Sequence, residues 1–354
     1  MPRNRVIYQS EAVYAGATGA SPQLLRRVQS CNYNFKIDRT DINQFGQLAA
    51  IDRQILQEPT VAVDLTYYYA TDTSNRNEEN LGLDLSGIHM LGSITSGVAA
   101  KEQRNIFIVT SSPGVDALGG AGVSTSSGII GIGNCFLTSW SLEAAVGAIP
   151  TVSCAFEGQN INFGTSNPVT QPNVDPNGVA STATVNFLQA AAYATTEVAA
   201  VRPGNITFTL GEANDGLPFG LSESDLKVQS ITVGLTLARE PLRKLGKHFA
   251  FARELTYPIM CTMTVNAIVG DLVIANLATL VGAAGGAGDL ATFTASITLT
   301  GWTTASSPAS SSSTFTLRGC KLNSQNITSS IGANKSVTME FGAQIGANSG
   351  LVMT

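Results

Sequence analysis

The sequence predicts a mainly β protein built from two tandem β-sandwich or small-barrel domains, each with one short flanking helix. Two observations predict this architecture. One half of the chain repeats the other at a fixed spacing, and apolar residues alternate with period two at equivalent places in both halves. At 354 residues the chain also exceeds the usual size of one domain.

The internal repeat is visible as identities at a constant shift. Val28-Gln29-Ser30 recurs as Val228-Gln229-Ser230, a shift of 200 residues (228 − 28). The same shift joins four more identical pairs: Arg39 with Arg239, Gly46 with Gly246, Ala50 with Ala250, and Arg53 with Arg253. One residue is then predicted to be lost, which sets Glu58-Pro59 opposite Tyr257-Pro258. Later the shift becomes 185 (332 − 147), through Gly147 and Gly332.

The repeat sets the predicted domain boundaries. Val6-Ile7-Tyr8 lies opposite Ile206-Thr207-Phe208, which predicts a first domain at 1–160 and a second at 201–354. Residues 161–200 are left over, contain few charges and include Pro176-Asn177-Gly178. This composition is typical of an inter-domain connector.

Alternating patterns predict the strands of each domain. In the first domain they are Asn32–Asp38, Val61–Tyr69, Arg104–Val109 and Thr151–Phe156. In the second they are Thr232–Leu237, Met260–Ile268, Thr292–Leu299, Thr314–Leu317 and Ser336–Phe341. The segments Asn77–Leu91 and Asp271–Val281 are predicted as the two helices, with Asn77 and Asp271 as N-caps.

A long segment lies between the first two predicted strands of each domain, at Arg39–Gln57 and Arg239–Leu255. Connections of this length are uncommon in compact domains unless they serve a function. Three structures fit: a protruding hairpin, a loop ordered only against a neighbour, or a surface Ω-loop. We favour contact with a neighbour.

Composition excludes several classes of function. Only 13% of residues are charged, the net charge is -5 and the pI is about 5.1, so tight binding of nucleic acid through massed Lys and Arg is not expected. The five widely spaced cysteines indicate reduced, buried thiols, and Met1–Tyr8 lacks the apolar run of a signal peptide. The apolar run Leu272–Val281 is about half the length of a membrane span.

Catalytic chemistry has no clear basis in the sequence. His89 and His248 are far apart and unrelated by the repeat, which argues against a metal or histidine site. Gly119–Gly122 and Gly285–Gly288 lack the Lys-Ser/Thr of a phosphate loop, and Ser306–Ser313 is predicted to be a low-complexity loop. Acidic residues fit solvated faces, although a carboxylate pair for glycoside hydrolysis stays open: Asp38, Asp41, Asp52 and Asp64. We expect no enzyme activity, no catalytic or metal-binding residues and no cofactor.

Short motifs in order along the chain resemble the major tail (tail tube) proteins of long-tailed bacteriophages. They are Tyr33–Arg39, Asn43–Gly46 and Glu58–Val61, their echo in Leu237–Leu242, Leu245-Gly246 and Tyr257-Pro258, and the later Ile132–Trp140, Gly147–Thr151 and Phe156–Gly158. The resemblance covers most of the chain.

The resemblance implies a structural virion protein whose rings stack into the hollow tail tube through which DNA passes. Two tube-like domains in one chain imply three chains in a ring with pseudo-sixfold symmetry. The implied partners are copies of itself, other tail proteins at the tube ends, and genomic DNA that passes the lumen without specific binding; no membrane is implied. The implied location is the virion tail, after synthesis and assembly in the host cytoplasm. The candidate inter-subunit contacts are Arg39, Phe45, Gly46, Arg53, Arg239, Leu245, Gly246 and Arg253.

Two other functions stay open at this stage. A capsid or capsid-decoration protein could also contain two β-sandwich domains. A carbohydrate-binding or adhesive module of a surface protein would be expected to show a secretion signal or an aromatic sugar platform, and Trp140 and Trp302 are the only tryptophans.

Overall fold

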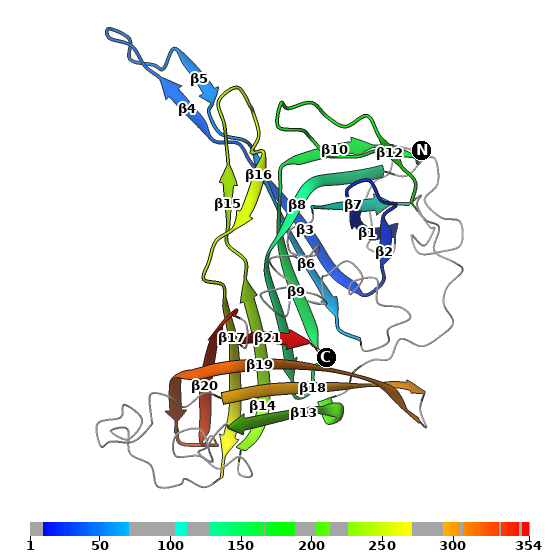
Figure 1. The fold of residues 1–354 in the computed structure, drawn as a ribbon, viewed down its shortest axis with the longest axis vertical. Helices are drawn as coiled ribbons and strands as arrows, with labels where there is room; N and C mark the ends of the chain where they lie inside the picture. Colours follow the sequence, from blue (N-terminus) through cyan, green and yellow to red (C-terminus); the bar gives the residue numbers. More distant parts are fainter. Residues whose placement is uncertain are drawn as a thin grey trace.

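The computed structural model describes residues 10–70, 103–111, 128–165, 167–187, 201, 203–212, 226–270, 293–304, 307–332, 334–346 and 349–353. Its regular secondary structure is almost entirely β-strand, which confirms the predicted mainly β fold (Figure 1). The strands of the first part are β1 (Glu11–Ala17), β2 (Gln23–Leu25), β3 (Val28–Lys36), β4 (Arg39–Ile42), β5 (Asp52–Ile55), β6 (Thr60–Tyr68), β7 (Arg104–Thr110), β8 (Gly128–Ala145), β9 (Thr151–Gly158), β10 (Asn160–Gly164), β11 (Val169–Thr170) and β12 (Thr184–Val185).

A short 3-10 helix, η3 (Pro203–Asn205), precedes the second set of strands. These are β13 (Ile206–Glu212), β14 (Leu226–Thr236), β15 (Arg239–Leu242), β16 (Ala252–Leu255), β17 (Met260–Val269), β18 (Phe293–Thr304), β19 (Ser307–Thr328), β20 (Ser336–Gln344) and β21 (Gly350–Met353). We refer to β1–β10 as the first unit and to β13–β21 as the second unit. In the described residues, no helix has the length and apolar character needed to cross a membrane.

One continuous antiparallel sheet runs through both units, and we call it the wall. Its strand order is β3-β6-β9-β8 in the first unit, followed by β14-β17-β20-β19 in the second. On the inner strands of the wall, alternate residues point into the core, as the burial of Val61, Val63 and Leu65 on β6 illustrates. Six of the nine strands predicted from period-two patterns are wall strands, and the other three lie in the smaller sheets described next.

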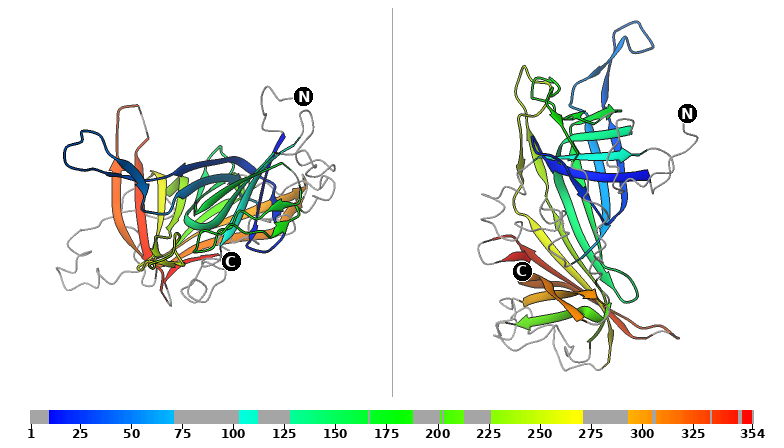
Figure 2. Two further views of the ribbon diagram at one scale, coloured as in Figure 1. Left: turned by 90° about the horizontal axis from the view of Figure 1, so that it is seen from above. Right: turned by 90° about the vertical axis from the view of Figure 1, so that its right-hand side faces the viewer.

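Each unit also has a smaller sheet that packs on the core side of the wall. In the first unit this small sheet contains β2, β1, β7, β10 and the first half of β8, and in the second it contains β13, β18, β21 and the first half of β19. The strands β8 and β19 are long because each one leaves the small sheet and continues into the wall (Figures 1 and 2). One hydrophobic core, which includes Trp140, Tyr67, Phe315 and Phe341, fills the space between the sheets.

The two units repeat each other down to their irregularities. The β3–β6 pairing shifts register between Val28 and Ser30, and the β14–β17 pairing shifts between Val228 and Ser230. The β8–β9 pairing shifts between Leu137 and Ser139, and the β19–β20 pairing shifts at the residues 185 later, Leu322 and Ser324. Bulges at matching positions indicate that the sequence repeat is a repeat of structure.

Two details of the predicted alignment are wrong. Phe35 pairs with Val61 and Leu235 pairs with Cys261, so the shift of 200 continues through β6 and β17 and no residue is lost at Pro59. The counterpart of Glu58 is therefore Pro258. In addition, β13 corresponds to β1, because each pairs with the equivalent strand of its small sheet, β18 or β7. The segment 6–8, which was aligned with β13, lies outside the described residues.

All nine predicted strands overlap observed ones, namely β3, β6, β7, β9, β14, β17, β18, β19 and β20. Three were predicted one or two residues too long, because β3 ends at Lys36, β6 at Tyr68 and β14 at Thr236. The predicted loop Ser306–Ser313 is wrong from residue 307 on, because β19 begins at Ser307 and pairs with β18. Near the end of this segment, β18 sets Leu299 opposite Ser313 and Thr300 opposite Ser312, and hydroxyl residues fit such a pleated strand. Both predicted helices, His89 and the two glycine runs lie outside the described residues.

The described part of the segment 161–187 packs against the first unit. β10 pairs with β8, and Phe187 packs its ring edge-on against Tyr14 and Phe107, with ring centroids 5.0 and 5.2 Å apart. With Val169 and Val185 these residues form a small apolar cluster on the face of the small sheet that is turned away from the main core. The five cysteines are free thiols, of which Cys31 is half buried and the others are buried.

Candidate self-assembly interface

The two units are joined by backbone pairing between β8 of the first and β14 of the second, which we call the intrachain joint. The register sets Trp140 opposite Leu235 and Leu142 opposite Val233, and all four side chains are buried. Joining edge strands in this way satisfies backbone groups that each unit would otherwise leave unpaired. The units therefore associate by extending one sheet.

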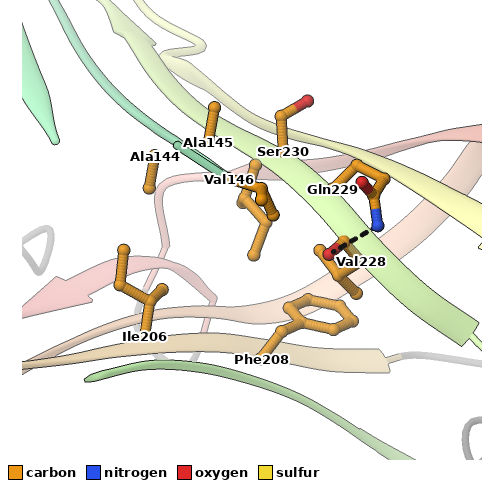
Figure 3. Close-up of a pocket in the computed structure, with 9 residues that line it drawn as sticks. Ala144, Ala145, Val146, Ile206, Phe208, Val228, Gln229 and Ser230 are labelled. Atoms are coloured by element: carbon orange, nitrogen blue, oxygen red, sulfur yellow. Dashed lines mark hydrogen bonds between the residues drawn. The ribbon is translucent and has the colours of Figure 1, made fainter. Parts of the chain in front are cut away.

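The intrachain joint continues past the end of β8. The Val146 amide donates a hydrogen bond of 2.9 Å to the Gln229 carbonyl oxygen. Around it lies a small, mostly apolar pocket, which Figure 3 shows between the end of β8, β13 and β14. Ile206 and Phe208 of β13 form its floor. The start of the β8–β9 turn of the first unit thus lies against β13 and β14 of the second unit.

At the other end of the joint, the β15–β16 hairpin of the second unit reaches back to the first unit. Arg253 donates from Nη1 to Glu157 Oε1 at 2.8 Å and from Nη2 to Glu58 Oε1 at 3.4 Å. The side chains of Arg253 and Glu58 are 5% and 1% exposed, so this ion pair is desolvated. A buried pair of this kind is costly to break, because the remaining charge has no compensation.

Glu58 accepts further hydrogen bonds from both units. Its Oε2 accepts hydrogen bonds from the Ala250 amide at 2.7 Å and from Gln159 Nε2 at 3.2 Å, while Arg243 lies 3.5 Å from Oε1. Several donors around one buried carboxylate satisfy the hydrogen-bonding capacity of its oxygens. Glu58 is thus the centre of the polar contact between the units.

Arg239 makes a further charged contact of this hairpin. Its guanidinium lies 4.8 Å from the centre of the Phe136 ring, and Nε donates to the Leu137 carbonyl oxygen at 3.3 Å. Burial, together with the positive charge of Arg253, lowers the pKa of Arg239 to about 10. The hairpin therefore brings cations to a surface that offers carboxylates, carbonyl oxygens and an aromatic ring.

A turn of the connector also holds the hairpin. The carbonyl oxygen of Pro176 accepts hydrogen bonds from the His248 and Phe249 amides at 3.0 and 3.2 Å. Asp175 accepts hydrogen bonds from the Asn177 side chain at Oδ2 and from the Val179 and Asn177 backbone amides at Oδ1, which lowers the pKa of Asp175. We call residues 175–178 the connector turn. The hairpin is thereby fixed on two sides.

The two outer edges of the wall are β3 and the second half of β19. Within the described residues, β3 pairs with β6 alone and this part of β19 pairs with β20 alone. Val233 and Leu235 of β14 are 0% and 2% exposed, whereas their counterparts on β3, Tyr33 and Phe35, are 36% and 55% exposed. The first unit therefore presents apolar side chains at the position where the second unit buries them.

The β4–β5 hairpin is the first unit's counterpart of β15–β16, and it projects away from the rest of the chain (Figures 1 and 2). Both long segments are thus the protruding hairpins that were one predicted alternative. Gly46 and Gly246 take positive φ angles of 84° and 79° at the tips, a conformation that favours glycine. Arg53 binds Asp41 of its own hairpin, with 2.6 Å between Nε and Oδ1, and this contact raises the pKa of Arg53.

The structure separates the eight candidate contact residues into two groups. Arg239 and Arg253 contact the first unit, while Leu245 and Gly246 lie at the tip of the same hairpin. The other four lie on the exposed β4–β5 hairpin: Arg39, Phe45, Gly46 and Arg53. The sequence prediction missed Glu58, Glu157 and Phe136. The sequence offered one signal for this contact. An acidic residue, Glu58, precedes Pro59, and the second long segment carries two recurring arginines that need acidic partners.

Comparisons with known proteins return little. No protein-family model and no curated protein matches the chain. Among solved structures, a chain of the anti-feeding prophage baseplate, 6-fold symmetrised, aligns with a TM-score of 0.30 and 8% identity over 47% of this chain and 99% of its own length. A chain of the tail of an empty GTA particle, with C6 symmetry, aligns with a TM-score of 0.28 and 7% identity over 45% and 98%.

Proposed function

We propose that this chain is a structural virion protein whose copies close into rings, and that the rings stack into a hollow phage tail tube. The observation that supports the proposal is the intrachain joint: a wall edge of one unit pairs with a wall edge of the next, and the chain presents the same two edges again at β3 and β19. Repeating the joint between chains, as an interchain joint, gives a closed ring when the rotation closes.

The interchain joint follows from the repeat by substitution of counterparts. Ser141 opposite Gly234 becomes Asn326 opposite Asn34, and Leu142 opposite Val233 becomes Ile327 opposite Tyr33. Trp140 opposite Leu235 becomes Gln325 opposite Phe35. The large aromatic residue is therefore on β8 in the intrachain joint and on β3 in the interchain joint. Where the side chain on one strand of the joint becomes smaller, the side chain opposite it becomes larger. This compensation is what a packed contact between β3 and β19 requires.

Ring size follows from the number of units. Three chains would supply six units and 24 wall strands, and at about 4.8 Å between strands the wall would have a diameter of roughly 37 Å. The small sheets would crowd the interior of such a ring, so we place them outside and the other face of the wall toward the lumen. That face carries mainly Ser, Thr, Ala, Gly and Asn, with four carboxylates and two lysines: Asp64, Glu143, Glu157, Glu340, Lys36 and Lys321. A lumen of this kind would let DNA pass without specific binding. A structural role of this kind needs no catalytic group or cofactor.

Electron microscopy of the purified protein tests this function. We expect hollow tubes built from rings of three chains with six similar units. Closed shells would support the capsid alternative, and monomers at all concentrations would contradict self-assembly. Tyr33→Asp should abolish rings because it sets a charge in the interchain joint. Tyr68→Asp, a similarly exposed tyrosine on β6, should leave them intact.

A further inference from the structure

The two hairpins differ in the surface that the repeat offers them. The first unit's wall provides Glu58, Glu157 and Phe136 to the arginines of β15–β16. The counterparts of these residues in the second unit are Pro258, Gly342 and Lys321. The β4–β5 hairpin of a neighbouring chain would therefore find no carboxylate at these positions, and a lysine in place of the aromatic ring.

In the β4–β5 hairpin, the arginine that would need these carboxylates has an acidic partner in the same hairpin. Asp41, which replaces Pro241, binds Arg53, the counterpart of Arg253. The cations Arg243, Lys244 and Lys247 of the second hairpin are replaced by Asn43, Gln44 and Gln47. The carboxylates are lost from one side of the contact, and on the other side Arg53 is paired within its own hairpin and three cations are replaced. The first hairpin is therefore not built to repeat the lateral docking of the second.

What the β4–β5 hairpin presents instead is apolar and exposed. Phe45 and Leu48 at its tip are fully exposed, its strands add Ile42 and Ile55, and Ile51 lies just before β5. The hairpin leaves the wall at the end where Lys36 pairs with Thr60. It therefore extends the wall along the direction of its strands (Figure 1).

Exposed apolar side chains also gather at the opposite end of the wall. The β8–β9 turn presents Val146 and Ile149, next to the pairing of Tyr68 with Thr151. The β19–β20 turn presents Ile331, which is fully exposed. Apolar surfaces at opposite ends of one molecule are complementary for head-to-tail contact between copies, which produces an open filament.

We propose that the β4–β5 hairpin binds another copy of this chain end to end, at the apolar turns 146–149 and 331 of the next ring. The β15–β16 hairpin stays docked inside its own chain. This inference rests on the ring proposed above and adds that the apolar end-to-end contact is threefold, because only one of the two hairpins in each chain takes part.

Paired tip variants test the proposal. Phe45→Ser combined with Leu48→Ser should leave single rings intact and raise the protein concentration needed for stacks at least about tenfold, because apolar burial between rings is lost. Leu245→Ser at the tip of β15–β16 is the matched control, since Leu245 is equally exposed. It should stack like the unaltered protein. Ile331→Ser should reproduce the defect from the opposite end.

The remaining outcomes distinguish a failure of the end-to-end contact from a failure of ring formation. Light scattering measures the molar mass of the rings, and electron microscopy of the same samples shows whether the rings stack. If the double tip variant stacks normally, the end-to-end contact is wrong while the ring stands. If the variant fails to form rings, the hairpin docks laterally and the proposal is also wrong. If the unaltered protein forms no rings, the proposed function fails first.

Discussion

The two units differ most on the face of the small sheet that is turned away from the main core. In the first unit this face is apolar and lies under the connector segment that carries Val169, Val185 and Phe187. In the second unit the counterparts are hydroxyl residues at every compared position: Thr207 for Ala12, Thr209 for Tyr14, Ser296 for Phe107, Thr298 for Val109 and Thr314 for Ile129. The same strand framework therefore accepts apolar or polar side chains, depending on whether another segment covers it.

A substitution that exchanges the two faces should have the largest effect. Phe107→Ser removes a buried ring from beneath Phe187 and should lower the free energy of unfolding by about 4 kcal/mol. Ser296→Phe, the reverse change, should alter it by less than about 1 kcal/mol, because no segment that the structure describes covers that face. Urea denaturation measures both, and equal effects would contradict the comparison.

The buried carboxylate at the intrachain joint comes next. Glu58→Gln keeps the size of the side chain but leaves Arg253 with Glu157 as its acidic partner, and should cost about 2 kcal/mol. Glu240→Gln, on the exposed side of the same hairpin contact, should change stability by less than about 0.5 kcal/mol. A loss at Glu58 no larger than that at Glu240 would show that the buried network does not hold the units together.

Asn134 offers a smaller test, because the repeat supplies its natural substitute. Asn134 has a φ of 56°, and its side chain binds the backbone of Val174 through both its oxygen and its nitrogen. The counterpart is Gly319, with a φ of 62°. Asn134→Gly should therefore keep the backbone and lose about 1 kcal/mol with the connector contact. Faster proteolysis between residues 167 and 187 would report the loosened segment, and unchanged cleavage would contradict its role as an anchor.

The connector turn predicts the smallest effect, a dependence on pH. Hydrogen bonds from Asn177 and Val179 lower the pKa of Asp175 below its ordinary value of 3.8. A lowered folded-state pKa stabilises the turn above the ordinary value, and this contribution disappears as the pH falls through the folded value. Titration of the Asp175 carboxyl by NMR should show a midpoint below 3.8. A midpoint at or above 3.8 would mean that the turn is not formed in solution.

Much of the fold could be predicted because it depends on local patterns. Alternation along Val61–Tyr69 reports a strand with one buried face, and the repeated Val-Gln-Ser marks the same bulge in both units. The alignment of Pro59 with Pro258 is wrong because matching the two prolines requires the loss of one residue. The strand pairing shows no such loss. The length of β8 was missed because nothing local indicates that one strand crosses between two sheets.

The candidate interface was harder to predict than the fold. The arginines of the long segments were noticeable because they recur, but Glu58 becomes significant only when Arg253, 195 residues away, folds against it. The intrachain joint likewise depends on contacts between β8 and β14 that no local pattern encodes. Sequence could identify one half of the ionic contact and not its partner.

The central claim is that the joint inside the chain is repeated between chains, and an engineered disulfide tests it most directly. With Asn34→Cys and Asn326→Cys in separate chains, mild oxidation of the mixture should give a covalent dimer, because these residues are the counterparts of Gly234 and Ser141. Ser30→Cys with Ser324→Cys is the register control: six residues out of step places the thiols about 20 Å apart and should give none. Cross-linking of the control pair, or of neither pair in assembled protein, would contradict the account.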